Sequence, residues 1–266
     1  MEATRRLEDV LALVREVGNK DATAGTLHRL GTLALAQGDY EQAVKCYAEA
    51  LAVSQDMGSK FHITLALCGL GQVAWAQGDN ERAAQRLEEA LSVSQEARSL
   101  PVSLTLYVSG TPALPTTTTP ARSLPVSLTL YVLGRVAYSQ GDYASAHSRF
   151  VESISLSQEL GQRGGVACNL EALAALAAAH DQMQPSPLRF EGLRRAARLC
   201  GAADALHDLS RFSLSPAERV ERDRALAAAR AALGEEAFAA VYAEGQAMTM
   251  EQAVEYALGG EPRSAE

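Results

Sequence analysis

The side chains best suited to metal or redox chemistry are the histidines and cysteines, and their spacing favours neither. The chain has 5 histidines and 4 cysteines. No two cysteines form a C-x-x-C pair, and the histidines do not pair at metal-ligand spacing. We therefore predict no metal site and no bound cofactor, and we interpret the cysteines as small core residues. The residues concerned are Cys46, Cys68, Cys168 and Cys200, with His28, His62, His147, His180 and His207.

The chain also lacks the short motifs that carry catalysis or nucleotide binding. It contains no H-E-x-x-H, no G-x-S-x-G, no G-x-G-x-x-G and no G-x-x-x-x-G-K-[ST]. Adjacent carboxylates occur at Glu88-Glu89 and Glu235-Glu236. Neighbouring positions of a helix point about 100° apart, so these pairs do not form a paired-carboxylate site. We predict that the protein is not an enzyme.

Composition narrows the class of partner. A net charge of −8 and a pI near 5.3 argue against nucleic acids and anionic membranes, which require a basic face. The longest apolar stretch, residues 172–179, is too short to cross a bilayer. The first six residues lead into an amphipathic helix without the apolar core of a signal peptide. We therefore expect a reduced, cytoplasmic protein.

The elements that must position any functional side chain are repeated helical hairpins. One pattern occurs three times: Leu-Gly, a small residue, Gly-Asp, Ala, and then Tyr, Leu or Phe. The first two occurrences are 40 residues apart, measured from Gln37 to Gln77. A fixed period indicates a stacked array, in which each unit buries its apolar face against its neighbours. The three occurrences begin at Leu30-Gly31, Leu70-Gly71 and Leu133-Gly134, and end at Tyr47, Leu87 and Phe150.

Each hairpin has the same predicted turn chemistry. A glycine ends the first helix, and the aspartate after it caps the second; these aspartates are Asp39, Asp79 and Asp142. Gln42 is expected to complete a capping box with Asp39. Residues 1–17 end at a glycine in the way that second helices do, so we expect a second helix whose first helix is missing. Either the helix is a shortened cap or, as we favour, the chain is part of a longer array with apolar surface left open.

A duplication interrupts the period. Residues 97–108 and 121–132 are the same twelve residues, offset by 24, with a low-complexity stretch rich in Thr and Pro between them. Removing 24 residues from the 63-residue gap between Gln77 and Gln140 leaves 39, which restores the period. We predict that the second copy completes the repeat and that residues 109–120 form a loop. A genetic accident or gene-model artefact is favoured over a regulatory loop.

The predicted fold is therefore all-α: an α-solenoid of antiparallel helix hairpins with a C-terminal helical cap. We expect the array over residues 1–182, with the inserted segment at about 97–120, and the cap over 183–266. A weaker fourth unit is expected to end near His180-Asp181 and to continue into a longer turn at 184–187. Further helices are predicted over 189–209, from Pro216 to a stop at Gly234, and from Thr249 to Gly259.

The repeat pattern resembles the tetratricopeptide repeat, a helix–turn–helix unit that builds binding surfaces. The tail, with Gly201 to Leu206, Leu214 to Arg219 and Leu233 to Phe238, resembles the end of the tetratricopeptide region in large bacterial regulators of the LuxR and maltose-regulator type. This resemblance implies that the repeats sense an inducer or a partner and restrain an ATPase module. The segment after Leu214 lacks a recognition helix suited to the major groove, so we expect no DNA binding.

The resemblance also implies a concave groove lined by the first helix of each hairpin. Trp75 and Tyr138 align with each other and with Leu35, one repeat apart, and Arg135 lies three residues before Tyr138. They are either core residues that fill the seam between helices or an aromatic platform with Arg135 as its polar anchor. The repeated Lys and Asn of chaperone-tail-binding arrays are missing. The candidate groove residues are His28, Thr32, Cys68, Gln72, Trp75, Tyr131, Arg135, Tyr138 and Glu171.

The function that follows is a non-enzymatic protein-interaction or sensor module of a bacterial transcriptional or signalling regulator, without ATPase or DNA-binding parts. The expected partner is a protein or peptide, such as a separate ATPase or regulator. The alternative is a receptor that binds a small-molecule inducer in the groove.

Overall fold

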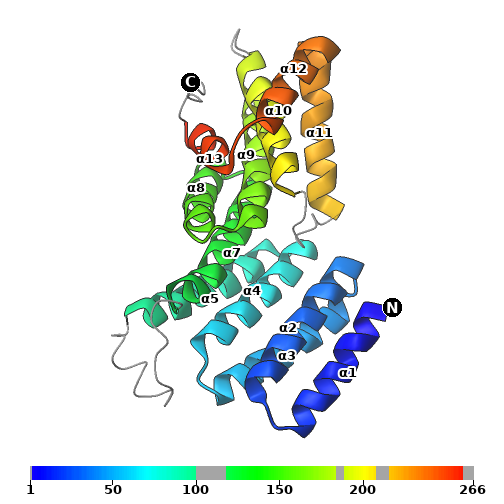
Figure 1. Cartoon of the computed structure of the whole chain (residues 1–266), viewed down its shortest axis with the longest axis vertical. Helices are drawn as coiled ribbons and strands as arrows, with labels where there is room; N and C mark the ends of the chain where they lie inside the picture. The colour runs from blue at the N-terminus through cyan, green and yellow to red at the C-terminus, as the bar shows by residue number, and fades with distance from the viewer. Residues whose placement is uncertain (1, 100–117, 184–188, 208–215, 260–266) are drawn as a thin grey trace. The chain divides into compact units, whose positions relative to one another are not determined.

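The computed structural model describes residues 2–99, 118–183, 189–207 and 216–259 (Figure 1). Every regular element in these ranges is an α-helix, which confirms the predicted all-α class. The chain divides into two compact units, residues 1–140 and 141–266. This division falls within the predicted array, at the turn before the helix that begins at Tyr143. The boundary between array and cap near residue 182 stays a prediction.

Unit 1 is a series of helices that pack in chain order. α2 packs on α3 and α4 on α5, as antiparallel hairpins, and α3 also packs on α4 (Figure 1). The first helices α2, α4 and α7 contact one another in turn, so they form a layer of their own. Unit 1 therefore has the stacked arrangement expected of an α-solenoid. Its helices are α1 (Glu2–Glu16), α2 (Lys20–Gln37), α3 (Tyr40–Asp56), α4 (Lys60–Ala76), α5 (Asn80–Ser99) and α7 (Thr118–Ser139).

The turns follow the sequence pattern closely. Gly38 and Gly78 end α2 and α4 with φ of +77° and +80°, a left-handed conformation that glycine adopts without strain. The Asp39 carboxylate accepts a hydrogen bond from the Gln42 backbone N–H at 3.0 Å, and Asp79 caps α5 in the same way. The capping box expected at Gln42 is only half formed. The Gln42 side chain instead donates to the Cys46 Sγ at 3.7 Å.

The core of each hairpin is built around the large residue near the middle of its second helix. Tyr47 and Leu87 both have an exposed fraction of 0%. A Cβ atom at Gly31 would lie 2.7 Å from the Tyr47 ring, and one at Gly69 would lie 2.4 Å from it. Tyr47 is therefore held between two glycines of successive first helices, α2 and α4. These glycines are required because close packing leaves no room for a side chain.

Two corrections concern the helix ends. α7 begins at Thr118, so residues 118–120 belong to a helix and not to the predicted loop over 109–120. The second copy of the duplicated segment lies in α7, as predicted, while residues 100–117 lie outside the described residues. α9 continues through the position of the expected break at His180-Asp181 as far as Met183. The α9 sequence has no glycine at that position to end the helix.

α1 is partly covered and partly open. Leu11 is buried against α2, and Val14 is half-buried beside the same core cluster. Val10, Leu13 and Val17 are 44%, 59% and 73% exposed. The spacing of these three residues places them on one helical stripe. An apolar surface is therefore open, as expected, and it lies at Val10, Leu13 and Val17.

Unit 2 consists of six further helices within the described ranges. α10 packs on α9, α11 and α12, and buries the predicted stripe of Ala196, Leu199, Ala203 and Leu206. Thr249 and Gln252 form a complete capping box at the start of the last helix. The helices are α8 (Tyr143–Glu159), α9 (Arg163–Met183), α10 (Arg189–His207), α11 (Pro216–Leu233), α12 (Glu235–Gln246) and α13 (Met250–Ala257).

Candidate interaction surface

Eight of the nine predicted groove residues lie on the first helices of unit 1. His28 and Thr32 are on α2, three residues are on α4, and three are on α7. Glu171 is on α9 of unit 2. We call the surface of unit 1 to which the eight contribute the first-helix face; its residues are His28, Thr32, Cys68, Gln72, Trp75, Tyr131, Arg135 and Tyr138.

Arg135 joins two aromatic side chains at the α4–α7 seam. Its guanidinium carbon lies 5.1 Å from the centroid of the Trp75 ring and 6.0 Å from that of Tyr138. These are cation–π distances, and the attraction is stronger where water is excluded. Arg135 is only 4% exposed. The arrangement therefore fastens α4 to α7, and the guanidinium is not presented to solvent as a polar anchor.

Cys68 belongs to the core. It is fully buried in one cluster with Leu87 and Val132, and Trp75 and Tyr131 pack against that cluster. Burial raises the pKa of the Cys68 thiol to about 12, although a hydrogen bond with Thr129 acts in the opposite direction. The thiol is therefore neutral and inaccessible. Cys68 supports the surface from beneath and cannot contact a partner.

His28 and Thr32 are linked through Tyr47. The His28 ring centroid lies 5.5 Å from that of Tyr47, and the Thr32 Oγ1 lies 3.2 Å from the Tyr47 hydroxyl oxygen. Burial, together with the smaller effects of the nearby charges of His62 and Arg29, lowers the pKa of His28 to about 4. His28 is therefore neutral at pH 7. Thr32 is exposed, so it is the member of this pair that a partner can reach.

His62 is a neighbour that sequence reasoning missed. It lies on α4, and its Nδ1 is 3.0 Å from the Ser59 Oγ and 3.6 Å from an Asp21 carboxylate oxygen. Burial lowers the pKa of His62, while Asp21 opposes that shift. The separation of His28 and His62 along the sequence does not match any metal-binding or catalytic motif. Only the packing of α2 on α4 brings the two histidines together.

The part of the first-helix face that remains accessible is smaller than predicted. Gln72, Trp75, Tyr131 and Tyr138 are half-buried, and Thr32 is exposed. Trp75 and Tyr131 pack on the core cluster of Cys68, and Tyr138 lies beside Arg135. Aromatic side chains held in this way give contact area with little loss of conformational entropy, a property of binding hot spots.

Glu171 takes part in a different arrangement within unit 2. It is 5% exposed, and its Oε1 lies 3.3 Å from the Nε of Arg222 on α11. Arg222 also pairs with Asp204 of α10, which accepts a hydrogen bond from the Tyr242 hydroxyl of α12. Burial, followed by Asp204, raises the pKa of Tyr242 to about 12. Glu171 is therefore part of a network that ties four helices together.

Two features are absent from the residues that the structure describes, a cluster that could hold a metal ion and a helix that could span a membrane. Within these ranges no three His, Cys, Asp or Glu side chains are grouped closely enough to hold a metal ion. Nor is any helix in the described part of the chain both long and apolar enough to cross a membrane.

Comparison with known protein families agrees with the repeat pattern. Residues 1–56 and 24–96 match the tetratricopeptide repeat model, and residues 123–180 match the model for anaphase-promoting complex subunit 5. No curated protein matches the chain. Residues 1–96 therefore form a tetratricopeptide region.

Proposed function

We propose that the chain is a non-catalytic protein-interaction module that binds a protein or peptide partner on its first-helix face. The observation that carries the proposal is the set of half-buried aromatic side chains on α4 and α7, Trp75, Tyr131 and Tyr138. Arg135 lies against Trp75 and Tyr138, and Tyr131 packs on the core. Rigid aromatic edges next to adaptable polar groups favour a protein surface. The exposed Thr32 and the half-buried Gln72 supply such polar groups.

The matched families support the same class of function. Tetratricopeptide repeats build binding surfaces, and the second model is named for a subunit of a multiprotein complex. From the resemblance of the tail to bacterial regulators, we propose that the partner is a separate cytoplasmic ATPase or regulator. The competing proposal is a receptor for a small-molecule inducer on the same face.

The test is capture of an ATPase or regulator encoded beside this chain, compared between two variants. Gln72→Arg places a charge on the first-helix face, whereas Ala48→Arg places the same charge on the exposed side of α3. We expect the first variant to lose the partner and the second to retain it. Equal capture by both variants contradicts the proposed surface. A calorimetric response to small metabolites that Gln72→Arg abolishes, without any protein partner, favours the inducer receptor.

A further inference from the structure

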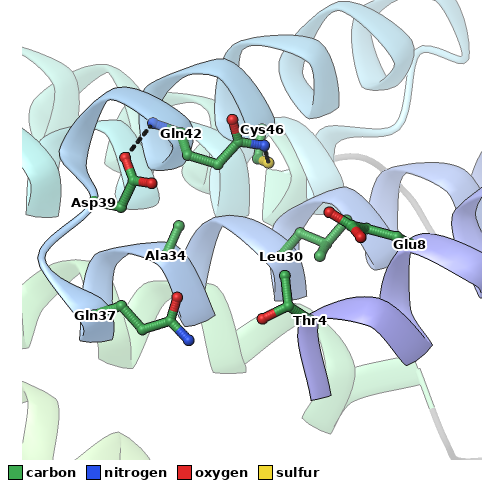
Figure 2. Close-up of a pocket in the computed structure, with 8 residues that line it drawn as sticks. All are labelled: Thr4, Glu8, Leu30, Ala34, Gln37, Asp39, Gln42 and Cys46. Carbon is green, nitrogen blue, oxygen red and sulfur yellow. Dashed lines mark hydrogen bonds between the residues drawn. The ribbon is translucent and has the colours of Figure 1, made fainter. Parts of the chain in front are cut away.

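A cavity of about 220 Å³ lies between α1, α2 and α3, away from the first-helix face (Figure 2). Its floor consists of Leu30 and Ala34 of α2 and Cys46 of α3, which are all buried. Its rim is polar, with Thr4 and Glu8 from α1 and three residues around the start of α3: Gln37, Asp39 and Gln42. The cavity thus combines an apolar floor with polar groups at its mouth.

The next repeat provides an internal comparison. A second cavity, of about 30 Å³, occupies the same repeat position 40 residues later, where Leu70, Ala74 and Gln77 replace the three α2 residues. Two of its wall residues are Arg82 and Arg86. Their counterparts in the first cavity are the shorter Gln42 and Cys46. The cavity of the first repeat is therefore larger at the positions where the second repeat has arginine side chains.

The negative charge of the larger cavity is complementary to a guanidinium group. Glu8 stands where the second repeat has Ala48, and Asp39 lies on the opposite side of the floor in Figure 2. The residues that line the cavity include these two carboxylates and no basic side chain. Asp39 is held in place because it caps α3 through the Gln42 N–H at 3.0 Å. An opposite charge entering the cavity therefore meets carboxylates from two different helices.

We propose that this cavity binds a guanidinium group, supplied either by free arginine or by an arginine side chain of a partner protein. The alkyl stem would lie on Leu30 and Ala34, and the guanidinium would face Glu8, with Asp39 at the other end of the floor. A cavity of about 150 Å³ already holds a benzene-sized molecule, so the volume suits a single side chain. The site is independent of the first-helix face, and each can fail without the other.

The experiment is calorimetric titration of the full chain at low salt with two probes, L-arginine and a terminally blocked arginine tripeptide. L-citrulline is the uncharged control, since it keeps the shape and loses the cation. Glu8→Gln removes one carboxylate from an exposed position and should weaken binding about fivefold. Glu41→Gln is the matched control, because Glu41 lies on α3 outside the cavity and pairs with Lys45. It should bind as the parent does.

Cys46→Arg places an arginine where the next repeat has Arg86, whose guanidinium pairs with Glu89 at 3.1 Å; the added side chain should fill the cavity and abolish binding. If that variant fails to fold, Glu8→Gln and the citrulline control carry the test. Binding of free arginine identifies a metabolite as the source, and binding of the tripeptide alone identifies a partner side chain. No binding of either probe, equal binding of citrulline, or unchanged binding by Glu8→Gln overturns the proposal.

Discussion

The fit between Tyr47 and Gly69 makes a quantitative prediction about how successive repeats pack. Tyr47 is fully buried, and a Cβ at Gly69 would lie 2.4 Å from its ring. In the next repeat the same two positions are occupied by Leu87 and Val132, which pack in one cluster. The first pair thus combines a large side chain with a glycine, which has no side chain. The second pair combines two side chains of intermediate size. The two pairs fill equivalent space in different ways.

Each single change towards the second repeat should be destabilising. Gly69→Val forces a side chain into the Tyr47 ring and should cost about 1–3 kcal/mol of unfolding free energy. Tyr47→Leu leaves a void and removes the hydrogen bond to Thr32, for a loss of about 2 kcal/mol. If the two effects were independent, the double variant would lose about 4 kcal/mol. Because the pair recreates Leu87 with Val132, we expect the double variant to lose less than about 2 kcal/mol.

The assay is urea unfolding followed by tryptophan fluorescence. The chain has 1 tryptophan, Trp75, which lies in unit 1 and reports on the packing of α4. Tyr47→Leu combined with Glu41→Gln, an exposed change on the same helix, is the control and should be additive. Additivity of Tyr47→Leu and Gly69→Val within about 0.5 kcal/mol would refute the packing argument.

Three further predictions concern other parts of unit 1. The folded pKa of His28 is about 4 against 6.5 for an unperturbed histidine, so stability should be complete above pH 6.5 and fall by on the order of 3 kcal/mol towards pH 4. His28→Gln should remove that part of the pH dependence of urea unfolding, and an unchanged pH profile would contradict the assignment. Replacing the exposed Leu13 and Val17 with lysine should reduce binding of a hydrophobic dye without loss of stability. A parent chain that is monomeric and binds no dye would contradict it. Deleting residues 97–120 should leave the melting temperature equal or higher, because it restores the 40-residue period and shortens a loop whose closure costs about 0.6 kcal/mol per doubling; unfolding of that variant would show that the inserted copy is structural.

The features predictable from sequence are those with local causes. Gly38 and Gly78 end helices because glycine adopts a positive φ, and Asp39 caps α3 through its own backbone neighbours. The recurring Tyr47 and Leu87 were predictable as buried positions, since both lie on the apolar stripe of a second helix. The hairpins and the all-α class follow from these signals.

The burial of each side chain in the first-helix face could not be predicted from such local signals. The repeat register selects a side of the helix, but Arg135 is buried because Trp75 and Tyr138 enclose it. Cys68 shares its core cluster with Val132, Leu133 and Val136 of α7, which lie far along the chain. Likewise, His62 approaches His28 only through the stacking of α2 on α4. Contacts between repeats therefore decide which register positions reach solvent.

The central claim is that the first-helix face of unit 1 binds a protein, and site-specific photo-crosslinking tests it most directly. A photoreactive phenylalanine analogue replaces Gln72 on α4 in one sample and the exposed Ala48 on α3 in another. Both are illuminated in cells that express the chain, and crosslinked proteins are identified by mass spectrometry. We predict one discrete adduct from position 72 that position 48 does not form. The same adducts from both positions, or adducts from position 48 alone, would contradict the account.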